Sequence, residues 1–284
     1  MKLYLDLETY SDVPIKRGVF RYAEDVDIDI IAWARDDEPV RVIDMRNPVH
    51  MRAGLPAFRE ALDAADEIYA HNAQFDRTIL AEKEFHTPLV KWRCTMARAY
   101  AHSLPGSLDV LCEVLKVPSD KAKHKRGKQL VQLFCKPLPK NSKLYRATPE
   151  THPAEWAEYL AYAGGDVEAC RELDKRLPTW NYRGRELSLW HLDQKINRRG
   201  ICVDKELVDA AIDVTTAAKK ELDRQMKHRT AGEIESATQR DKLLQHLLET
   251  YGVDLPDMRA DTLERRIEDP DLPEPVKELL HFRS

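Results

Sequence analysis

The chain has 284 residues, a formal net charge of −4, and a composition of 43% hydrophobic and 33% charged residues. This is enough apolar material for a sizeable core in one large domain, or in one domain with a smaller companion. The sequence contains no apolar run of about 18 residues and no charged leader followed by an apolar stretch, which excludes a membrane span and a secretory signal.

The first half of the chain alternates between predicted strands and helices. An acidic turn at residues 36–38 joins the second strand to the third and predicts a hairpin. The predicted strands, which are rich in β-forming residues, are residues 1–7, 28–35, 39–45 and 67–71. Helical spacing of apolar residues predicts helices over 56–65, from about Gln74 with Asn72 near its cap, and over 107–115, 127–134 and 153–177. The fold class is therefore α/β.

Beyond this α/β region the sequence predicts only helices. Residues 185–199 form an amphipathic stretch that stops at Gly200, a typical signal for the end of a helix. Asp204 then precedes a further helix as its cap. We place a domain boundary near residue 180, between a first domain of residues 1–180 and a smaller helical segment of residues 181–284.

The five cysteines are scattered, and no C-x-x-C motif occurs among them. We expect reduced thiols in a cytoplasmic protein, without a disulfide framework or a zinc site. The mildly acidic net charge argues against binding of nucleic acid through bulk charge alone. It remains compatible with an enzyme that holds a short piece of strand at a metal-loaded site, where the ions supply positive charge.

Two carboxylates lie side by side on the first predicted strand. Asp6 and Glu8 are two residues apart, so they share one face, while Leu5 and Leu7 point the other way. Adjacent carboxylates repel each other and are costly to bury unpaired, and a divalent cation would relieve both effects. The alternative is that Asp6 is a surface residue and Glu8 lies in a solvated turn.

Two further acids follow predicted elements. Asp76 stands at the start of a helix, where the helix N-terminus alone also favours a negative charge. Tyr162 and Asp166 are four residues apart and share one face of a long helix. Gly164 and Gly165 between them each cost about 1 kcal/mol relative to alanine, so we expect a close backbone approach there. The alternative is a helix break, with Tyr162 as a packing residue.

The densest basic stretch covers residues 121–128 and includes Lys123, Lys125 and Lys128. One interpretation is that these lysines contact the phosphate backbone of single-stranded DNA. The other is that the stretch is a solvated loop without a ligand.

In combination, the acids and the tyrosine resemble the ribonuclease-H-like 3′→5′ exonucleases with four acidic ligands and a tyrosine. Residues 6–11 (DLETYS) and 18–25 (GVFRYAED) are similar to the proofreading domain of family A DNA polymerases, of the DNA polymerase I type and phage-like. This resemblance covers residues 1–178. Residues 196–204 (INRRGICVD) look like the stretch that leads such polymerases from the exonuclease into the palm and thumb.

The resemblance implies a fold, an activity and partners. The fold is a ribonuclease-H-like exonuclease fold, a central mixed sheet flanked by helices, followed by the incomplete start of a palm and thumb. The activity is metal-dependent hydrolysis of DNA from the 3′ end, with release of nucleoside monophosphates, in a bacterial or phage-infected cell. The substrate is single-stranded DNA or the frayed 3′ end of a primer. The family's polymerase motifs do not occur before Ser284, so we expect no DNA synthesis by this chain alone, and a separate or missing polymerase domain.

The resemblance also implies the roles of the acids. Asp6, Glu8 and Asp166 hold one of two divalent cations, Mg²⁺ or Mn²⁺, and Asp6 with Asp76 positions the second. Tyr162 hydrogen-bonds the attacking water. A tyrosine has an ordinary pKa of about 10, so it is a poor base at neutral pH and its role is to orient.

Three more residues receive roles from the resemblance. Thr9 and Asn72 contact the terminal nucleotide, and Phe75 shapes the pocket. Family members carry a lysine-rich loop at the position of the basic stretch. The residues themselves leave simpler roles open, because a threonine or asparagine near a turn is commonly a local cap and a phenylalanine commonly packs in a core.

Two other functions remain open from the sequence. A ribonuclease D-like 3′→5′ exoribonuclease shares the tyrosine-bearing acid set, although the two polymerase-like stretches favour the DNA enzyme. A catalytically silent module that binds DNA or a polymerase is the second, and the presence of all four acids argues against it.

Overall fold

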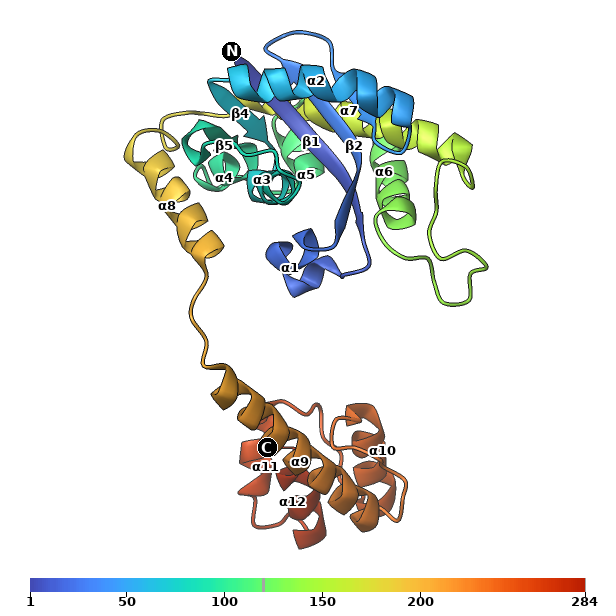
Figure 1. The fold of residues 1–284 in the computed structure, drawn as a ribbon. Helices are drawn as coiled ribbons and strands as arrows, with labels where there is room; N and C mark the ends of the chain where they lie inside the picture. The colour runs from blue at the N-terminus through green and yellow to red at the C-terminus, as the bar shows by residue number, and fades with distance from the viewer. Residues whose placement is uncertain (119–120, 284) are drawn as a thin grey trace. The chain divides into compact units, whose positions relative to one another are not determined.

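The computed structural model describes residues 1–118 and 121–283, and the side chains of residues 121–125 fall outside that description. The chain divides into two compact units, Met1–Gly200 and Ile201–Ser284, which are described separately (Figure 1). The first unit contains β1 (Lys2–Ser11), η1 (Ile15–Arg17), α1 (Val19–Ala23), β2 (Val26–Arg35), β3 (Arg41–Asp44), α2 (Pro48–Ala64), β4 (Glu67–Ala70), α3 (Ala73–Glu82), η2 (Leu89–Lys91), β5 (Trp92–Cys94), α4 (Thr95–Tyr100), α5 (Leu108–Val114), α6 (Lys121–Phe134), α7 (Pro153–Arg176) and α8 (Arg185–Arg199).

A mixed five-stranded sheet forms the centre of the first unit, in the order β3-β2-β1-β4-β5. β1 pairs antiparallel with β2, and β2 pairs antiparallel with β3, which confirms the predicted hairpin. β4 runs parallel to both β1 and β5. Helices cover both faces, and Figure 1 shows α2 and α7 on opposite sides of the sheet. The predicted α/β class and the ribonuclease-H-like arrangement are confirmed.

β1 runs through the middle of the sheet and separates two cores. Leu3, Leu5 and Leu7 belong to the core beneath α2 and α3. Tyr4 faces the other way, into the core beneath α6 and α7. Because side chains alternate along a strand, Asp6 joins Tyr4 on the face that α7 covers. The position of the acids follows from this alternation.

α7 is continuous through its two central glycines, so the alternative of a helix break is wrong. The expected close backbone approach is also wrong. A methyl group on Gly165 would meet no atom within 4 Å from the described residues beyond its own stretch of helix, and one on Gly164 would lie 3.4 Å from a Val42 methyl group, an ordinary contact. The glycines between Tyr162 and Asp166 therefore do not receive a neighbouring backbone.

Other elements also differ from the predictions, among them α6, which begins at Lys121 and not at residue 127. α2 begins at Pro48 and not at residue 56, because the Asn47 side chain accepts hydrogen bonds from two backbone N–H groups of the first turn. Pro56, where the apolar spacing predicted the helix start, lies inside this helix. The short strand β5 and the helix α4 were not predicted, because three strand residues carry too little pattern.

The first compact unit ends at Gly200, whereas the predicted domain boundary lay at residue 180. α8 accounts for the difference, because it packs on the sheet. Trp190 contacts the core beneath α2 and α3. His191 Nε2 donates to the Trp92 carbonyl at 3.1 Å, and the buried Gln194 accepts from Arg77 at 3.3 Å.

The second unit consists of helices around its own small core. Asp204 caps the first of them as predicted, since its carboxylate accepts from the Leu207 N–H at 3.0 Å. Met226, Leu243 and Val276 are completely buried in this core. Within the described part of the chain, no helix combines the length and the apolar character that a membrane crossing requires. The helices are α9 (Lys205–Arg229), α10 (Arg240–Tyr251), α11 (Ala260–Ile267) and α12 (Glu274–His281).

Candidate active site

Asp6 and Glu8 lie at the centre of β1, on the face that α7 covers. Asp6 is paired with Ala32 of β2 and Glu8 with Ile30, and the register shifts immediately after Glu8. Such a bulge bends a strand and redirects the side chains beside it. Glu8 is only 7% exposed, which is incompatible with the alternative of a solvated turn.

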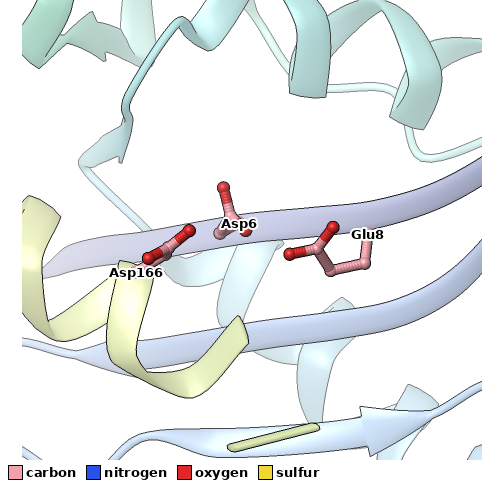
Figure 2. Close-up of side chains that lie close together, drawn as sticks. All are labelled: Asp6, Glu8 and Asp166. Carbon is pink, nitrogen blue, oxygen red and sulfur yellow. The ribbon is translucent and has the colours of Figure 1, made fainter. Parts of the chain in front are cut away.

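Asp166 on α7 completes a group of three carboxylates. One oxygen each of Asp6, Glu8 and Asp166 lies within 4.8 Å of the others. Figure 2 shows the three side chains directed toward one another, two from the strand and one from the helix. The predicted pairing of strand acids with the late helix is therefore present in the fold.

Asp76 approaches the same place from α3. It sits in the first turn of the helix, as the sequence indicated, yet it is buried at 2% exposure. A hydrogen bond from the backbone N–H of Leu7 reaches its carboxylate, which places Asp76 beside β1. Its negative charge acts on both Asp6 and Glu8, although it lies outside the close group of three.

The four acids form an electrostatic conflict in the absence of cations. Burial raises the pKa of Asp6 well above its usual range, and the charges of the other three acids raise it further. Burial likewise raises the pKa of Glu8 and of Asp76 to about 8. Such clustering of raised pKa values is typical of functional sites.

The donor set fits a hard divalent cation. Carboxylate oxygens are the ligands that Mg²⁺ and Mn²⁺ prefer, and oxygens that share such an ion lie about 3–4 Å apart. The oxygens of Asp6, Glu8 and Asp166, all within 4.8 Å of one another, are close enough to share one such ion. A bound cation would also remove the repulsion that raises the pKa values of the acids.

Glu8 is held from behind by residues that the sequence analysis did not select. The Tyr159 hydroxyl donates to Glu8 Oε2 at 2.5 Å, and Cys135 Sγ lies 2.9 Å from the same hydroxyl. The pattern of Trp156, Tyr159 and Tyr162 at intervals of three residues on α7 is the signal that could have drawn attention to Tyr159.

Tyr162 packs between α6 and the ring of Tyr159. The two tyrosine rings are stacked at 6.3 Å with an interplanar angle of 13°. On the other side, Gly127 of α6 approaches so closely that a methyl group there would lie 2.3 Å from Tyr162 Cε2. Burial and the charges of Asp166 and Glu8 raise the pKa of Tyr162 far above its usual value, so its hydroxyl stays protonated.

The three residues predicted to contact a nucleotide lie in different environments. Thr9 is buried and its hydroxyl shares a hydrogen bond of 2.8 Å with Tyr22. Phe75 is half-buried, with its ring 5.8 Å from that of Tyr22. Asn72 precedes α3 in a left-handed conformation (φ 67°), its side chain is exposed, and it makes no capping hydrogen bond. These nucleotide contacts stay predictions.

The basic stretch forms the N-terminal half of α6. Lys123 and Lys125 lie outside the described side chains. Lys128 is exposed, and its Nζ lies 3.7 Å from an Asp109 carboxylate oxygen.

His71, next to Asn72, has a structural role. Its Nε2 donates to the Gly106 carbonyl at 2.7 Å, and its Nδ1 accepts from the Thr95 hydroxyl at 2.9 Å. Both ring nitrogens are thus used, which leaves no lone pair for a metal ion.

Comparisons with known proteins agree with this geometry. A family model described as 3′-5′ exonuclease, of the DNA polymerase A class, matches residues 28–179. That range contains Asp76, Tyr162 and Asp166, while Asp6 and Glu8 precede it. The DNA polymerase of Bacillus phage SP02 is 33% identical over 294 residues, an alignment that covers 99% of this chain. The chain spans 43% of the length of that polymerase.

Proposed function

The chain belongs to the family of 3′→5′ exonuclease domains of family A DNA polymerases, and from this premise we propose that it removes nucleotides from the 3′ end of DNA as a proofreading exonuclease. The observation that carries the proposal is the convergence of Asp6, Glu8 and Asp166 within 4.8 Å, on the sheet face that α7 covers. The phage polymerase relative supports DNA as the substrate, and a bacterial or phage-infected cell as the setting.

The acids divide into two overlapping sets. Asp6, Glu8 and Asp166 would hold one divalent cation, and Asp6 with Asp76 would hold a second. When bound, two such ions generate the nucleophile from water and stabilise the leaving 3′ oxygen. The raised pKa values of the buried acids support this assignment, because cations are the partners that these carboxylates need.

Tyr162 would orient the attacking water. Its protonated hydroxyl is hydrogen-bonded to Asp166, so the phenol oxygen offers a lone pair to one hydrogen of that water. A phenol that keeps its proton is not a base, and the proton of the water must leave by another route. Activity is therefore expected to rise with pH through the neutral range, without a plateau near the pKa of histidine.

The DNA end would enter beside Asn72 and Phe75, with α6 nearby. The exposed side chain of Asn72 suits contact with the terminal nucleotide. Thr9, which is hydrogen-bonded to Tyr22, would line the nucleotide pocket together with that tyrosine. Lys123, Lys125 and Lys128 would contact phosphates of the single strand.

A comparison of matched DNA and RNA oligomers tests the substrate. Each oligomer is labelled at the 5′ end and incubated with Mg²⁺, and the products are separated by length. A ladder that shortens from the 3′ end on DNA, with slower loss of RNA, supports the proposal. Faster loss of RNA would identify a ribonuclease D-like enzyme, and no loss of either, by a chain that still binds DNA, would identify a silent binding module.

Substitution of Lys128 by alanine tests the phosphate contact. Binding of single-stranded DNA is measured in Ca²⁺ at several salt concentrations, beside a Lys83→Ala control at the end of α3. Loss of one phosphate contact reduces the slope of log affinity against log salt by about 0.7. An unchanged slope would show that Lys128 is only solvated.

DNA synthesis is the activity that we do not assign to this chain. We propose that polymerisation requires a separate or additional polymerase domain. A primer-extension assay tests this, and extension by the purified chain would contradict it.

A further inference from the structure

Tyr159 is a completely buried residue of α7 whose hydroxyl reaches the metal site. It donates to Glu8 Oε2 at 2.5 Å, and the thiol of Cys135 lies 2.9 Å behind it. Neither Tyr159 nor Cys135 is among the four acids; the Tyr159 ring packs in the core beneath α6 and α7, while its hydroxyl contacts Glu8.

The direction of the hydrogen bonds follows from the number of protons. A phenol has one proton, and in this chain the carboxylate of Glu8 receives it. With that proton committed, the Cys135 thiol is the donor in its 2.9 Å contact with the phenol oxygen, and its Sγ also lies 4.0 Å from Glu8 Oε2. The three groups form a chain of donors that ends on Glu8.

The aromatic rings around Tyr159 leave its hydroxyl one position. Its ring stacks on Phe134 at 5.1 Å with an interplanar angle of 17°, and on Tyr162 at 6.3 Å. The edge of Trp156 closes a third side at 5.9 Å. A donor that is fixed in this way also fixes the plane of the carboxylate that it contacts.

We propose that Tyr159 is the positioning residue that orients the Glu8 carboxylate toward the cation, with Cys135 as its anchor. A glutamate side chain has three rotatable bonds, and a carboxylate that is free to rotate must be ordered when a metal ion binds. Partners that fix a metal ligand from behind are commonly worth a factor of about 10 to 100 in metal affinity. This inference rests on the proposed function of the same site.

Tyr159→Phe removes the hydroxyl and keeps the ring, and Tyr4→Phe is the matched control. Tyr4 lies in the same core, and its hydroxyl donates to the carboxylate of Asp174 at 2.7 Å. Mn²⁺ alone is titrated into the full chain and followed by water proton relaxation. We expect Tyr159→Phe to weaken Mn²⁺ binding by about 10- to 100-fold, while Tyr4→Phe leaves it unchanged.

A double-mutant cycle with Glu8→Gln separates positioning from a general loss of structure. If Tyr159 acts through Glu8, adding Tyr159→Phe to Glu8→Gln causes little further loss of Mn²⁺ affinity. Cys135→Ala retains the tyrosine, and we expect a smaller loss in the same direction. Should Tyr159→Phe not fold, Cys135→Ala decides the question alone.

The outcomes distinguish this inference from the proposed function. A wild-type chain that binds Mn²⁺ and degrades DNA, with Tyr159→Phe binding Mn²⁺ as tightly as wild type, overturns the inference and leaves the function in place. Equal losses in Tyr159→Phe and Tyr4→Phe, or additive losses in the cycle, overturn it as well. A wild-type chain that binds no Mn²⁺ overturns both.

Discussion

Replacement of Gly127 by alanine tests whether α6 sets the position of Tyr162. The new methyl carbon would lie 2.3 Å from Tyr162 Cε2 and 2.7 Å from Cδ2. Carbon atoms in contact lie about 3.5–4.0 Å apart, so the ring or the helix must move by about 1 Å. A misplacement of that size commonly lowers the rate of a positioned reaction by about 100-fold. We expect such a fall in kcat and a smaller loss of Mn²⁺ affinity, because Tyr162 is not among the proposed metal ligands but its ring stacks on Tyr159.

Gly165→Ala is the matched control, since it lies on α7 beside Asp166 and, in the part of the chain that the structure describes, no other element comes within 4 Å of the new methyl group. We expect wild-type kcat from it and a gain in stability of about 0.5–1 kcal/mol. The assay is single-turnover release of nucleotides from 5′-labelled single-stranded DNA. In a Tyr162→Phe background, Gly127→Ala should cause only a small further loss. Wild-type kcat in Gly127→Ala, or an equal loss in Gly165→Ala, would refute the reasoning.

Three further outcomes follow from the charges. Asp6→Asn should increase the free energy of unfolding of the metal-free chain by about 1–2 kcal/mol, and so raise its melting temperature, because it removes repulsion among the acids. The same change should abolish the stabilisation by Mg²⁺. Calorimetry with and without Mg²⁺ checks both expectations. Burial raises the pKa of Glu8 and Asp76 to about 8 in the folded chain, so the folded state binds more protons than the unfolded state, and metal-free stability should fall as pH rises from about 5 to about 8. Denaturant unfolding across that range measures the slope, which saturating Mg²⁺ should flatten. Arg146→Ala should lower the free energy of unfolding, measured in urea, by about 1–3 kcal/mol. The Arg146 guanidinium lies 2.8 Å from the carboxylate of Asp29, which is buried and would lose this partner.

The positions of the acids could be predicted because alternation along a strand is a local property. Asp6 and Glu8 had to share a face once β1 was recognised, and the leucines on either side of Asp6, Leu5 and Leu7, identified the opposite face. Asp166 followed from its spacing with Tyr162 on a helix. The expectation that these two faces meet came from the resemblance to a family and not from the spacing itself.

Contacts between elements that are distant in sequence could not be predicted. Tyr159 reaches Glu8 across 151 residues, and no local pattern marks such a pair. The close approach that we expected at Gly164 and Gly165 occurs instead at Gly127, because the helix that packs on Tyr162 is α6. A glycine in the sequence indicates that a close approach is possible, but it does not identify the residue that packs against it.

The extent of α8 shows a similar limit. Its amphipathic pattern predicted the helix itself, with Gly200 at its end. The pattern does not say which core the apolar face joins, so the boundary was placed before the helix. Contacts of Trp190 and Gln194 with the first unit show that α8 belongs to that unit.

The most direct test of the central claim is a time course on a 5′-labelled single-stranded DNA oligomer, with Mg²⁺ and with EDTA, for the wild-type chain and Asp166→Asn. If Asp6, Glu8 and Asp166 form the metal site, the labelled products should form a ladder that shortens one nucleotide at a time from the 3′ end. We expect this ladder only in Mg²⁺ and only for the wild type. Degradation that persists in EDTA, or an Asp166→Asn variant as active as wild type, would contradict the account.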